Sequence, residues 1–258
     1  MNQIGKFFMD NGYYLARGVY AKAEVRRLEE EFDRIVRQLM DSREDINARW
    51  EGAQNEKLQA KDTVVLHTHN VHKYSRLWLD AFLQKSFLAL AEEILGPDIV
   101  LHHSKLFQKP PEKGAPFPTH QDWSYFPTLK DTMIAAVIHV SKSTDEMGCL
   151  RVYPGSHQLG RVQGTAGMGG QDDCNTAFYD SYPLEGATPL EAGPGDVAFF
   201  HYLTIHGSKP NLSAEARKTV LVQMFSGHDR VEDGGWHPND NLVLKGWNYE
   251  MNRKRAGE

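Results

Sequence analysis

Two histidines and one aspartate in the second half of the chain could hold a metal ion. His120 and Asp122 stand two residues apart in the segment PTHQDWSYFP. On a strand, side chains at this spacing project from the same face, while Gln121 between them points away. His206, which follows an apolar and aromatic segment, is the candidate third ligand. Two imidazoles and one carboxylate on one face of an octahedral ion leave three positions open, which is the ligand set of non-heme Fe(II) oxygenases.

An arginine follows the third candidate ligand closely enough in the sequence to belong to the same site. Arg217 lies eleven residues after His206, across a short polar segment. A hairpin there would return the next strand beside the first and bring the guanidinium into the same interior. A guanidinium grips a carboxylate with two hydrogen bonds, as a dicarboxylic co-substrate would require. Each feature alone is common at exposed strand ends, whether it is an HxD sequence, a histidine before glycine or an arginine that opens a strand. Only their combination specifically indicates a metal and co-substrate site.

The composition describes a globular chain without a strongly charged partner. The 258 residues carry a net charge of -5, with 24% charged and 10% aromatic residues, which gives no footprint for nucleic acid or an anionic membrane. Cys149 and Cys174 are too few and too far apart for a disulfide framework, so we expect a reducing compartment and a cytoplasmic location. The N-terminus does not read as a signal peptide, and no run of 18 apolar residues predicts a membrane span.

Helices are expected mainly in the first hundred residues. Apolar residues recur at spacings of three and four between Ala23 and Met40, which predicts an amphipathic helix. A second helix is predicted from about Leu79 to Leu95, where Gly96 and Pro97 would end it. The polar, aperiodic segment 42–62 between them is expected to be a long surface loop.

Short strands are expected from Asp98 onward. Segments rich in β-branched and aromatic residues alternate with turn residues, at 99–107, 132–140, 149–153, 196–203 and 218–227. No comparable helical period interrupts them, which favours an antiparallel sandwich or barrel with flanking helices. The Gly-rich segment 159–181 lacks the GK[ST] ending of a phosphate loop, so we interpret it as a lid or a flexible insertion.

Four motifs of this chain resemble the phytanoyl-CoA dioxygenase family of Fe(II)/2-oxoglutarate oxygenases. They are HQDWSYFP, MGCLRVYPGSH, PGDVAFFHYLTIHGS and the Arg217 that follows, in the order and spacing of the family. The opening FFMDNGYYLARGVYAKAEV resembles the family's first helix, strand and second helix. The resemblance implies one domain with a double-stranded β-helix core, also called a jelly roll or cupin-like fold. Residues 1–97 would form a mainly helical support, 98–228 the core and 229–258 a C-terminal extension.

The resemblance also implies roles for individual residues. His120, Asp122 and His206 would bind iron, Arg217 would bind the distal carboxylate of 2-oxoglutarate, and Ser208 would support that carboxylate. Further positions near the co-substrate correspond to Lys105, Asn70 and Val137, although the family often has an apolar residue in place of Lys105 and an aromatic one in place of Val137. Trp123 and Tyr125, directly after the metal motif, are candidates for the substrate wall, whereas Phe126 could equally be core.

The implied reaction is hydroxylation of an unactivated C–H bond of a small organic metabolite. It uses Fe(II), 2-oxoglutarate and dioxygen, releases succinate and carbon dioxide, and has ascorbate as a candidate reductant. Related halogenases have a small residue at the position of Asp122, so its carboxylate favours an oxygenase. The alternative is 2-hydroxylation of an acyl-CoA, but phosphates of CoA call for a basic patch, and the one dense basic cluster is at 253–255.

Two other functional classes stay open, namely a ligand-binding jelly roll without redox chemistry and a zinc hydrolase. His67, His69 and His72 could supply part of a zinc site, but their favoured interpretation is hydrogen bonding near the mouth of the active site. Five further histidines are expected to be structural, at positions 102, 103, 139, 157 and 201. The sequence identifies neither the substrate nor the oligomeric state.

Overall fold

The computed structural model describes residues 3–42, 64–165, 175–233 and 238–251. Its helices are α1 (Gln3–Asn11), α2 (Lys22–Ser42), α4 (Val71–Tyr74), α5 (Arg76–Phe82), α6 (Lys85–Leu95) and α7 (Thr176–Ser181). Short 3-10 helices are η1 (Asp122–Ser124), η2 (Ser156–Leu159) and η4 (Leu184–Gly186). The strands are β1 (Tyr13–Ala16), β2 (Leu66–His69), β3 (Ile99–Lys109), β4 (Phe117–His120), β5 (Ile134–His139), β6 (Leu150–Val152), β7 (Thr188–Pro189), β8 (Val197–His201), β9 (His206–Ser208), β10 (Arg217–Ser226) and β11 (Leu242–Lys245).

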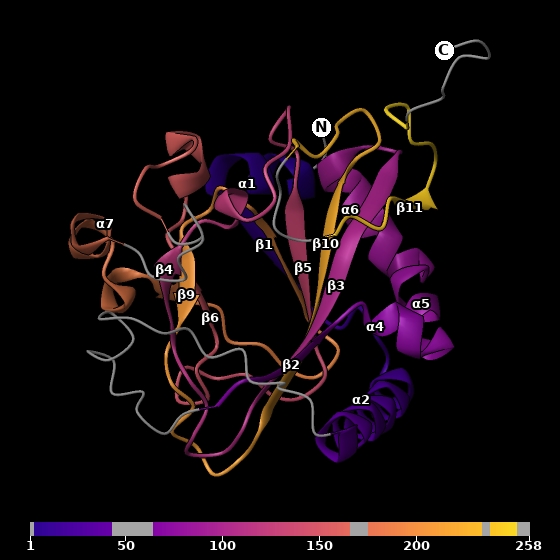
Figure 1. Ribbon diagram of the computed structural model, residues 1–258, viewed down its shortest axis with the longest axis vertical. Coiled ribbons are helices and arrows are strands. Elements are labelled where there is room, and N and C mark those ends of the chain that lie inside the picture. Colours follow the sequence, from indigo (N-terminus) through magenta and orange to yellow (C-terminus); the bar gives the residue numbers. More distant parts are fainter. Residues whose placement is uncertain (1–2, 43–63, 166–174, 234–237, 252–258) are drawn as a thin grey trace.

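Two antiparallel sheets form the core. The larger sheet has the strand order β1-β8-β5-β10-β3-β11, with β2 also paired to β3, and the smaller has the order β4-β9-β6-β7. Figure 1 shows β4, β9 and β6 facing the strands β5, β10 and β3 across the interior of the molecule. The β-rich core with flanking helices agrees with the predicted fold class, and the strands expected at five segments are β3, β5, β6, β8 and β10.

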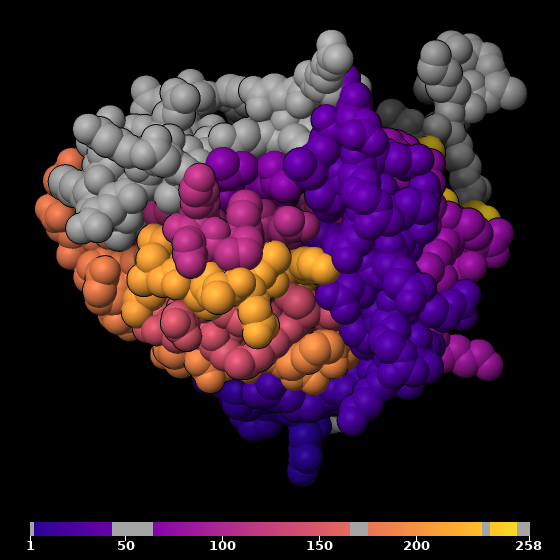
Figure 2. Space-filling model, turned by 90° about the horizontal axis from the view of Figure 1, so that it is seen from below, coloured from indigo at the N-terminus to yellow at the C-terminus, as the bar shows by residue number. Residues whose placement is uncertain are grey.

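Helices cover the outer face of the larger sheet, as Figure 1 shows for α2, α5 and α6. α2 realises the predicted amphipathic helix, and it buries Val25, Leu28, Phe32, Ile35, Val36 and Leu39. These side chains join one apolar cluster with the outward side chains of β3, β5, β8 and β10. Phe32 is fully buried, so its truncation to alanine would cost about 3 to 5 kcal/mol. Figure 2 shows the N-terminal residues gathered on one side of the molecule and segments of the core on the other.

The helix predicted over residues 79–95 is wrong in one respect, because it is two helices. α5 ends at Phe82 and α6 begins at Lys85, with Gln84 in an extended conformation between them. Phe82 and Phe87 on either side of the break are both fully buried, so the apolar period continues across it and hides the interruption. Gly96, with φ 88°, ends α6 as expected. The predicted loop over 42–62 lies outside the described residues, apart from Ser42 at the end of α2.

The predicted hairpin between His206 and Arg217 is also wrong. β8 ends at His201, and His206 opens β9, which belongs to the smaller sheet. The chain then returns to the larger sheet, where β10 lies between β5 and β3. The turn after His201 therefore carries the chain from one sheet to the other. This crossing still places His206 and Arg217 on walls that face the same interior.

Candidate active site

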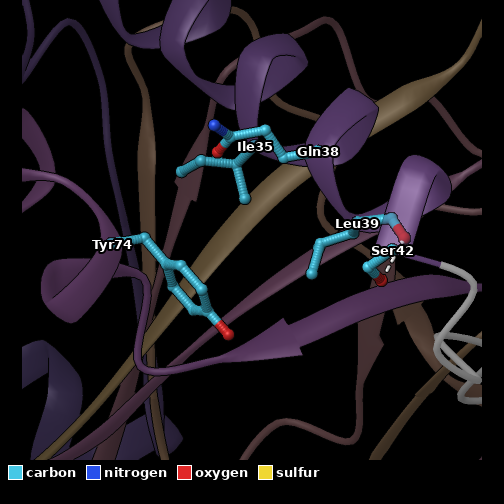
Figure 3. A pocket seen from close by; sticks show the side chains of 5 residues that line it. All are labelled: Ile35, Gln38, Leu39, Ser42 and Tyr74. Carbon is cyan, nitrogen blue, oxygen red and sulfur yellow. Dashed lines mark hydrogen bonds between the residues drawn. The ribbon is translucent and has the colours of Figure 1, made fainter.

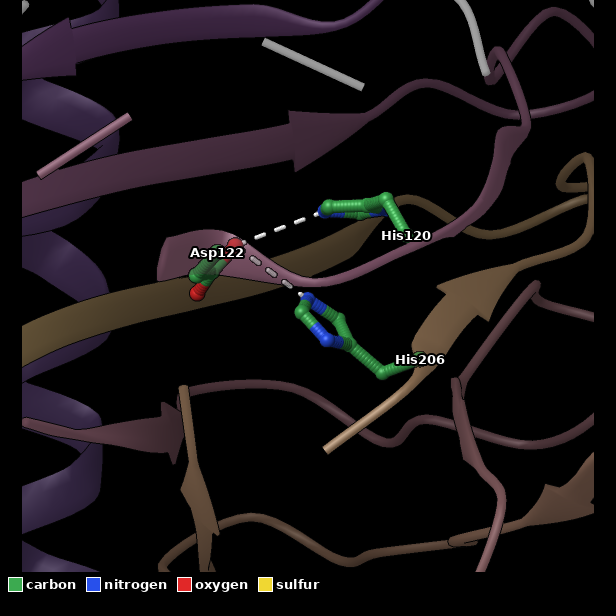
Figure 4. Close-up of side chains that lie close together, drawn as sticks. All are labelled: His120, Asp122 and His206. Atoms are coloured by element: carbon green, nitrogen blue, oxygen red, sulfur yellow. Dashed lines mark ion pairs between the residues drawn. The ribbon is translucent and has the colours of Figure 1, made fainter. Parts of the chain in front are cut away.

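The two sheets bring His120, Asp122 and His206 together. His120 ends β4 and His206 opens β9, and the two residues are direct partners in the register of these strands. Their Nε2 atoms lie 3.4 Å and 3.5 Å from Oδ1 of Asp122, the first residue of η1. Figure 4 shows both imidazoles directed at this carboxylate. All three residues are buried, and within the described ranges they form the one group of potential ligands whose atoms lie within 4.8 Å of one another.

Hydrogen bonds fix the tautomer of both histidines. Nδ1 of His120 is 2.8 Å from the carbonyl oxygen of Pro118, and Nδ1 of His206 is 2.9 Å from that of Thr204. A carbonyl only accepts, so each Nδ1 must carry the proton and each Nε2 keeps its lone pair for a metal. Burial and the neighbouring His120 lower the pKa of His206 to about 4. His206 is therefore neutral at physiological pH, as a metal ligand must be.

Asp122 is held ionised with one oxygen turned toward the histidines. Burial raises its pKa, but the nearby His206 and His120 and a hydrogen bond from Gln223 together bring the pKa below its usual value. Nε2 of Gln223, on β10, donates to Oδ2 of Asp122 at 2.9 Å. The other oxygen, Oδ1, faces both imidazoles. Two imidazoles and a carboxylate fit Fe(II), so the donor set agrees with an iron centre.

A second polar group lies on the same interior and consists of two buried cations. Lys109 at the end of β3 and Arg217 at the start of β10 are partners in the register of these strands. Nζ of Lys109 donates to Oγ of Ser208 and to the carbonyl oxygen of Lys209, both at 2.6 Å. Arg217 donates from Nη1 to the carbonyl oxygen of Gly148, while its Nε has no hydrogen-bond partner among the described residues.

Burial lowers the pKa of both cations. The pKa of Lys109 falls well below its ordinary value because of burial and the nearby Arg217, and burial lowers the pKa of Arg217 to about 10. Among the described residues, no carboxylate forms an ion pair with either side chain. Buried charges are costly without a partner, so this pair is suited to receive an anion.

The predicted co-substrate residues are only partly brought together. Arg217 belongs to the cation pair, and Ser208 contacts it. Lys105 is not part of it, because its Nζ lies over the Phe107 ring, 4.8 Å from the centroid. Lys109, which sequence reasoning missed, contacts Ser208 instead. Lys105 and Lys109 are four residues apart on one strand and therefore share a face. The predicted strand ended at Phe107, and extending it to Lys109 would have placed this second lysine on the inward face.

The remaining predicted residues differ in their surroundings. Tyr125 sets its ring edge-on to His120, with centroids 6.5 Å apart. Trp123 is half-buried beside the metal motif, whereas Phe126 packs into a buried apolar cluster. Asn70 precedes α4 with φ 56°, and its Oδ1 is buried without a hydrogen-bond partner in the described part of the chain. Val137 on β5 packs in the interior with other apolar side chains.

Two other features of the described residues have structural explanations. Nε2 of His72 lies 2.8 Å from Asp240, and its Nδ1 lies 2.9 Å from Oγ of Ser104, so His72 ties the C-terminal segment to β3.

A pocket between α2 and α4 is lined by Ile35, Gln38, Leu39, Ser42 and Tyr74 (Figure 3). Its volume of about 160 Å³ is small for a metabolite site, and it lies in the helical layer away from the interior.

Cys149 lies directly after Gly148, whose carbonyl oxygen receives the guanidinium of Arg217. The thiol is fully buried. Burial raises its pKa to about 11, although the nearby Arg217 acts in the opposite direction. Cys149 is therefore a neutral thiol beside the cation pair.

Comparisons with known proteins agree with the fold and with the class of enzyme. The family model of phytanoyl-CoA dioxygenase (PhyH) matches residues 8–219. A probable alpha-ketoglutarate-dependent hypophosphite dioxygenase of Stutzerimonas stutzeri is 29% identical over 222 residues, covering 83% of this chain and 75% of the relative. The human peroxisomal phytanoyl-CoA dioxygenase is 29% identical over 236 residues, covering 86% of this chain and 67% of the relative.

The fold also matches a solved structure of the epimerase SnoN in complex with Fe3+, alpha ketoglutarate and nogalamycin RO. The TM-score is 0.71 at 19% sequence identity, with 94% of this chain and 98% of the other covered. Fold, site and relatives together define a 2-oxoglutarate-dependent non-heme iron dioxygenase with a double-stranded β-helix core. Because the family model spans most of the sequence, the chain belongs to the phytanoyl-CoA dioxygenase family. In the described part of the chain, no helix is long and apolar enough to cross a membrane.

Proposed function

We propose that this enzyme hydroxylates an unactivated C–H bond of a small organic metabolite at the His120, Asp122 and His206 group. In this proposal Fe(II) binds to these three residues, and the distal carboxylate of 2-oxoglutarate binds between Arg217 and Lys109. The observation that carries the proposal is the pairing of two incomplete sites on one interior. A buried ligand set has room for a cation, and a buried cation pair has no carboxylate among the described residues.

The protein's part in the reaction follows from these contacts. Fe(II), when bound with 2-oxoglutarate and dioxygen, supplies the oxidising chemistry, and the co-substrate leaves as succinate and carbon dioxide. The backbone carbonyls behind His120 and His206 hold both Nε2 atoms toward the metal. Gln223 holds Oδ2 of Asp122 and leaves Oδ1 for the metal.

At the other end, Ser208 accepts from Lys109 and keeps its ammonium directed into the site. The side chains of Lys109 and Arg217 are already in place in the folded protein, so little reorganisation is needed when the dicarboxylate arrives. Apolar side chains, including Val137 and Phe200, line the interior. They would exclude water from the reacting atoms.

The substrate class is the part of the proposal with two candidates. A free small metabolite is the first, because the buried cations Lys109 and Arg217 are already given to the co-substrate in this proposal. An acyl-CoA is the second, supported by the 29% identity to a phytanoyl-CoA dioxygenase. The basic cluster at 253–255 that could serve a CoA ester lies outside the described residues.

We also propose that the chain works as a single domain in the cytoplasm. β1 from the N-terminal region and β11 from the C-terminal region both extend the larger sheet, which favours one folding unit. The fully buried Cys149 and the low cysteine content agree with a reducing compartment. The predicted lid over 159–181 stays a prediction, since residues 166–174 lie outside the described part.

The proposal is tested by mixing the protein with Fe(II) and 2-oxoglutarate without oxygen. We expect a visible charge-transfer band, followed by succinate release when air and candidate metabolites or acyl-CoA esters are added. Absence of the band would contradict the proposal. Tight binding of zinc with hydrolysis and no consumption of 2-oxoglutarate would favour the hydrolase, and neither reaction would favour the ligand-binding jelly roll.

A further inference from the structure

Gln121, the residue between the two metal ligands of the HxD motif, is fully buried. Its side-chain amide uses every hydrogen-bonding position that it has. Nε2 donates to the carbonyl oxygens of Leu203 at 2.6 Å and Gly160 at 2.9 Å. Oε1 accepts from the indole N–H of Trp123 at 2.8 Å and from the backbone N–H of Val162 at 2.9 Å. Two acceptors and two donors around it permit only one orientation of the amide.

The four partners belong to three different parts of the site. Trp123 follows Asp122 directly, and Leu203 lies in the turn that carries the chain to His206. Gly160 and Val162 belong to the segment 160–165, which follows η2. The backbone N–H of Gln121 also donates to Oγ1 of Thr165 at 2.7 Å. The segment 160–165 is thus bonded at three points to the residue that separates His120 from Asp122.

Arg161 fixes the same segment from its outer side. Its guanidinium forms ion pairs with Asp131 at 2.8 Å and Glu232 at 2.7 Å. It also donates to the carbonyl oxygen of Thr128 at 2.6 Å and lies 5.3 Å from the centre of the Trp123 ring. The ring is therefore held at its indole N–H by Gln121 and on its face by Arg161.

We infer that Gln121 is a positioning residue that couples the docking of the segment 160–165 to the geometry of the metal ligands. When the segment is bonded, the amide draws the HxD motif and the turn before His206 to fixed places and orients Trp123 beside the site. When the segment leaves, two donors and two acceptors of a buried amide lose partners, and the motif loses its restraint. The inference rests on the proposed iron site for its consequence, but the coupling itself is a property of the metal-free protein.

The forward test replaces Gln121 by glutamate, which has nearly the same shape. A carboxylate can still accept from Trp123 and Val162, but its second oxygen meets the carbonyls of Gly160 and Leu203 and repels them. In metal-free Gln121→Glu protein we expect amide hydrogen exchange of peptides covering 160–165 to accelerate at least about tenfold. We also expect the affinity for Fe(II), measured without 2-oxoglutarate, to fall at least about threefold.

Gln158→Glu is the matched control. Gln158 is exposed in η2 next to the same segment, and its side chain makes one hydrogen bond, to the carbonyl oxygen of Asp10 at 3.1 Å. This variant should leave both measurements unchanged. Exchange that rises equally across all peptides of Gln121→Glu would mean general unfolding and would contradict a specific coupling.

The reverse test starts from the segment and reads the metal site. Arg161→Leu removes the outer ion pairs without touching a metal ligand or Gln121, and Arg161 is partly exposed, so the variant should fold. We expect faster exchange at 160–165 together with weaker Fe(II) binding. Faster exchange with unchanged Fe(II) affinity would overturn the inference. If wild-type protein binds no Fe(II) at all, the proposed function fails, while exchange in Gln121→Glu still decides whether Gln121 holds the segment.

Discussion

The proposed metal end of the interior, with Asp122, and the proposed co-substrate end, with Lys109 and Arg217, differ in the charge that each is missing. At the metal end, Asp122 meets two imidazoles and an amide, and the Nε2 atoms of both imidazoles face its Oδ1 atom. At the other end, Lys109 and Arg217 are buried beside a hydroxyl and carbonyl oxygens, and no described carboxylate pairs with them. The first end needs a cation and the second needs an anion. Each ligand would therefore supply the charge that the fold leaves out, and so would stabilise the folded state.

Removing the carboxylate should abolish the metal end. For Asp122→Ala we expect the affinity for Fe(II) to fall by about 100-fold or more, because one of three ligands and the site's negative charge are lost. The visible band with Fe(II) and 2-oxoglutarate should disappear, as it should for His120→Ala. A band that survives either substitution would show that the iron is held elsewhere.

Removing the guanidinium should affect the co-substrate end alone. Arg217→Ala should weaken 2-oxoglutarate binding by about 100-fold, since truncating one partner of a buried charged contact costs about 2 to 5 kcal/mol. Iron affinity, measured by titration without the co-substrate, should stay within about twofold. Arg217→Lys is the control, because it keeps the charge but loses the bidentate geometry and should be intermediate. Unchanged affinity for 2-oxoglutarate in Arg217→Ala would remove Arg217 from the site.

Replacing the lysine should change stability and binding in opposite directions. Lys109→Met keeps the length of the side chain and removes a buried charge that lacks a carboxylate partner. We expect the protein without ligands to gain about 1 kcal/mol in free energy of unfolding, and 2-oxoglutarate affinity to fall by about 30-fold. Thermal unfolding with and without the co-substrate measures both. A variant that is less stable and binds normally would mean that Lys109 is a structural residue.

The smallest effect is expected behind the metal ligand. Gln223→Leu removes the hydrogen bond to Oδ2 of Asp122 and should lower Fe(II) affinity by about tenfold, the lower range for a residue behind a ligand. Co-substrate affinity at saturating iron should change less. Equal losses at both ends would show that Gln223 supports the β10 strand in general rather than the carboxylate in particular.

Sequence reasoning predicted that His120, Asp122 and His206 lie together, as they do in the structure, but it missed the residues that depend on strand register. The HxD spacing predicts two adjacent ligands from local geometry alone, although Asp122 sits in a 3-10 helix rather than in a strand. Lys109 is opposite Arg217 only because β3 and β10 pair at that register, which no local pattern states. For the same reason the hairpin predicted before Arg217 is wrong, although the observed crossing between sheets also places His206 and Arg217 on the same interior.

Gln121 was missed for a different physical reason. The alternation of a strand directs it away from the metal, and sequence reasoning stopped there. Its importance comes from four partners that the folded chain brings from separate segments, and their spacing along the sequence carries no period. The split of the helix over 79–95 was hidden in a related way, because the residues on both sides of the break face the same core.

The burial of Cys149 has a consequence for the lifetime of the enzyme. An enzyme that turns over dioxygen at iron generates oxidants close to its own side chains, and a thiolate is the form of cysteine that they attack first. With a pKa of about 11 and no exposed surface, Cys149 stays a thiol and is shielded from attack. It also does not compete with the histidines for a soft metal. The fold thus keeps a sulfur atom next to Arg217 and Lys109 without making it a point of oxidative damage.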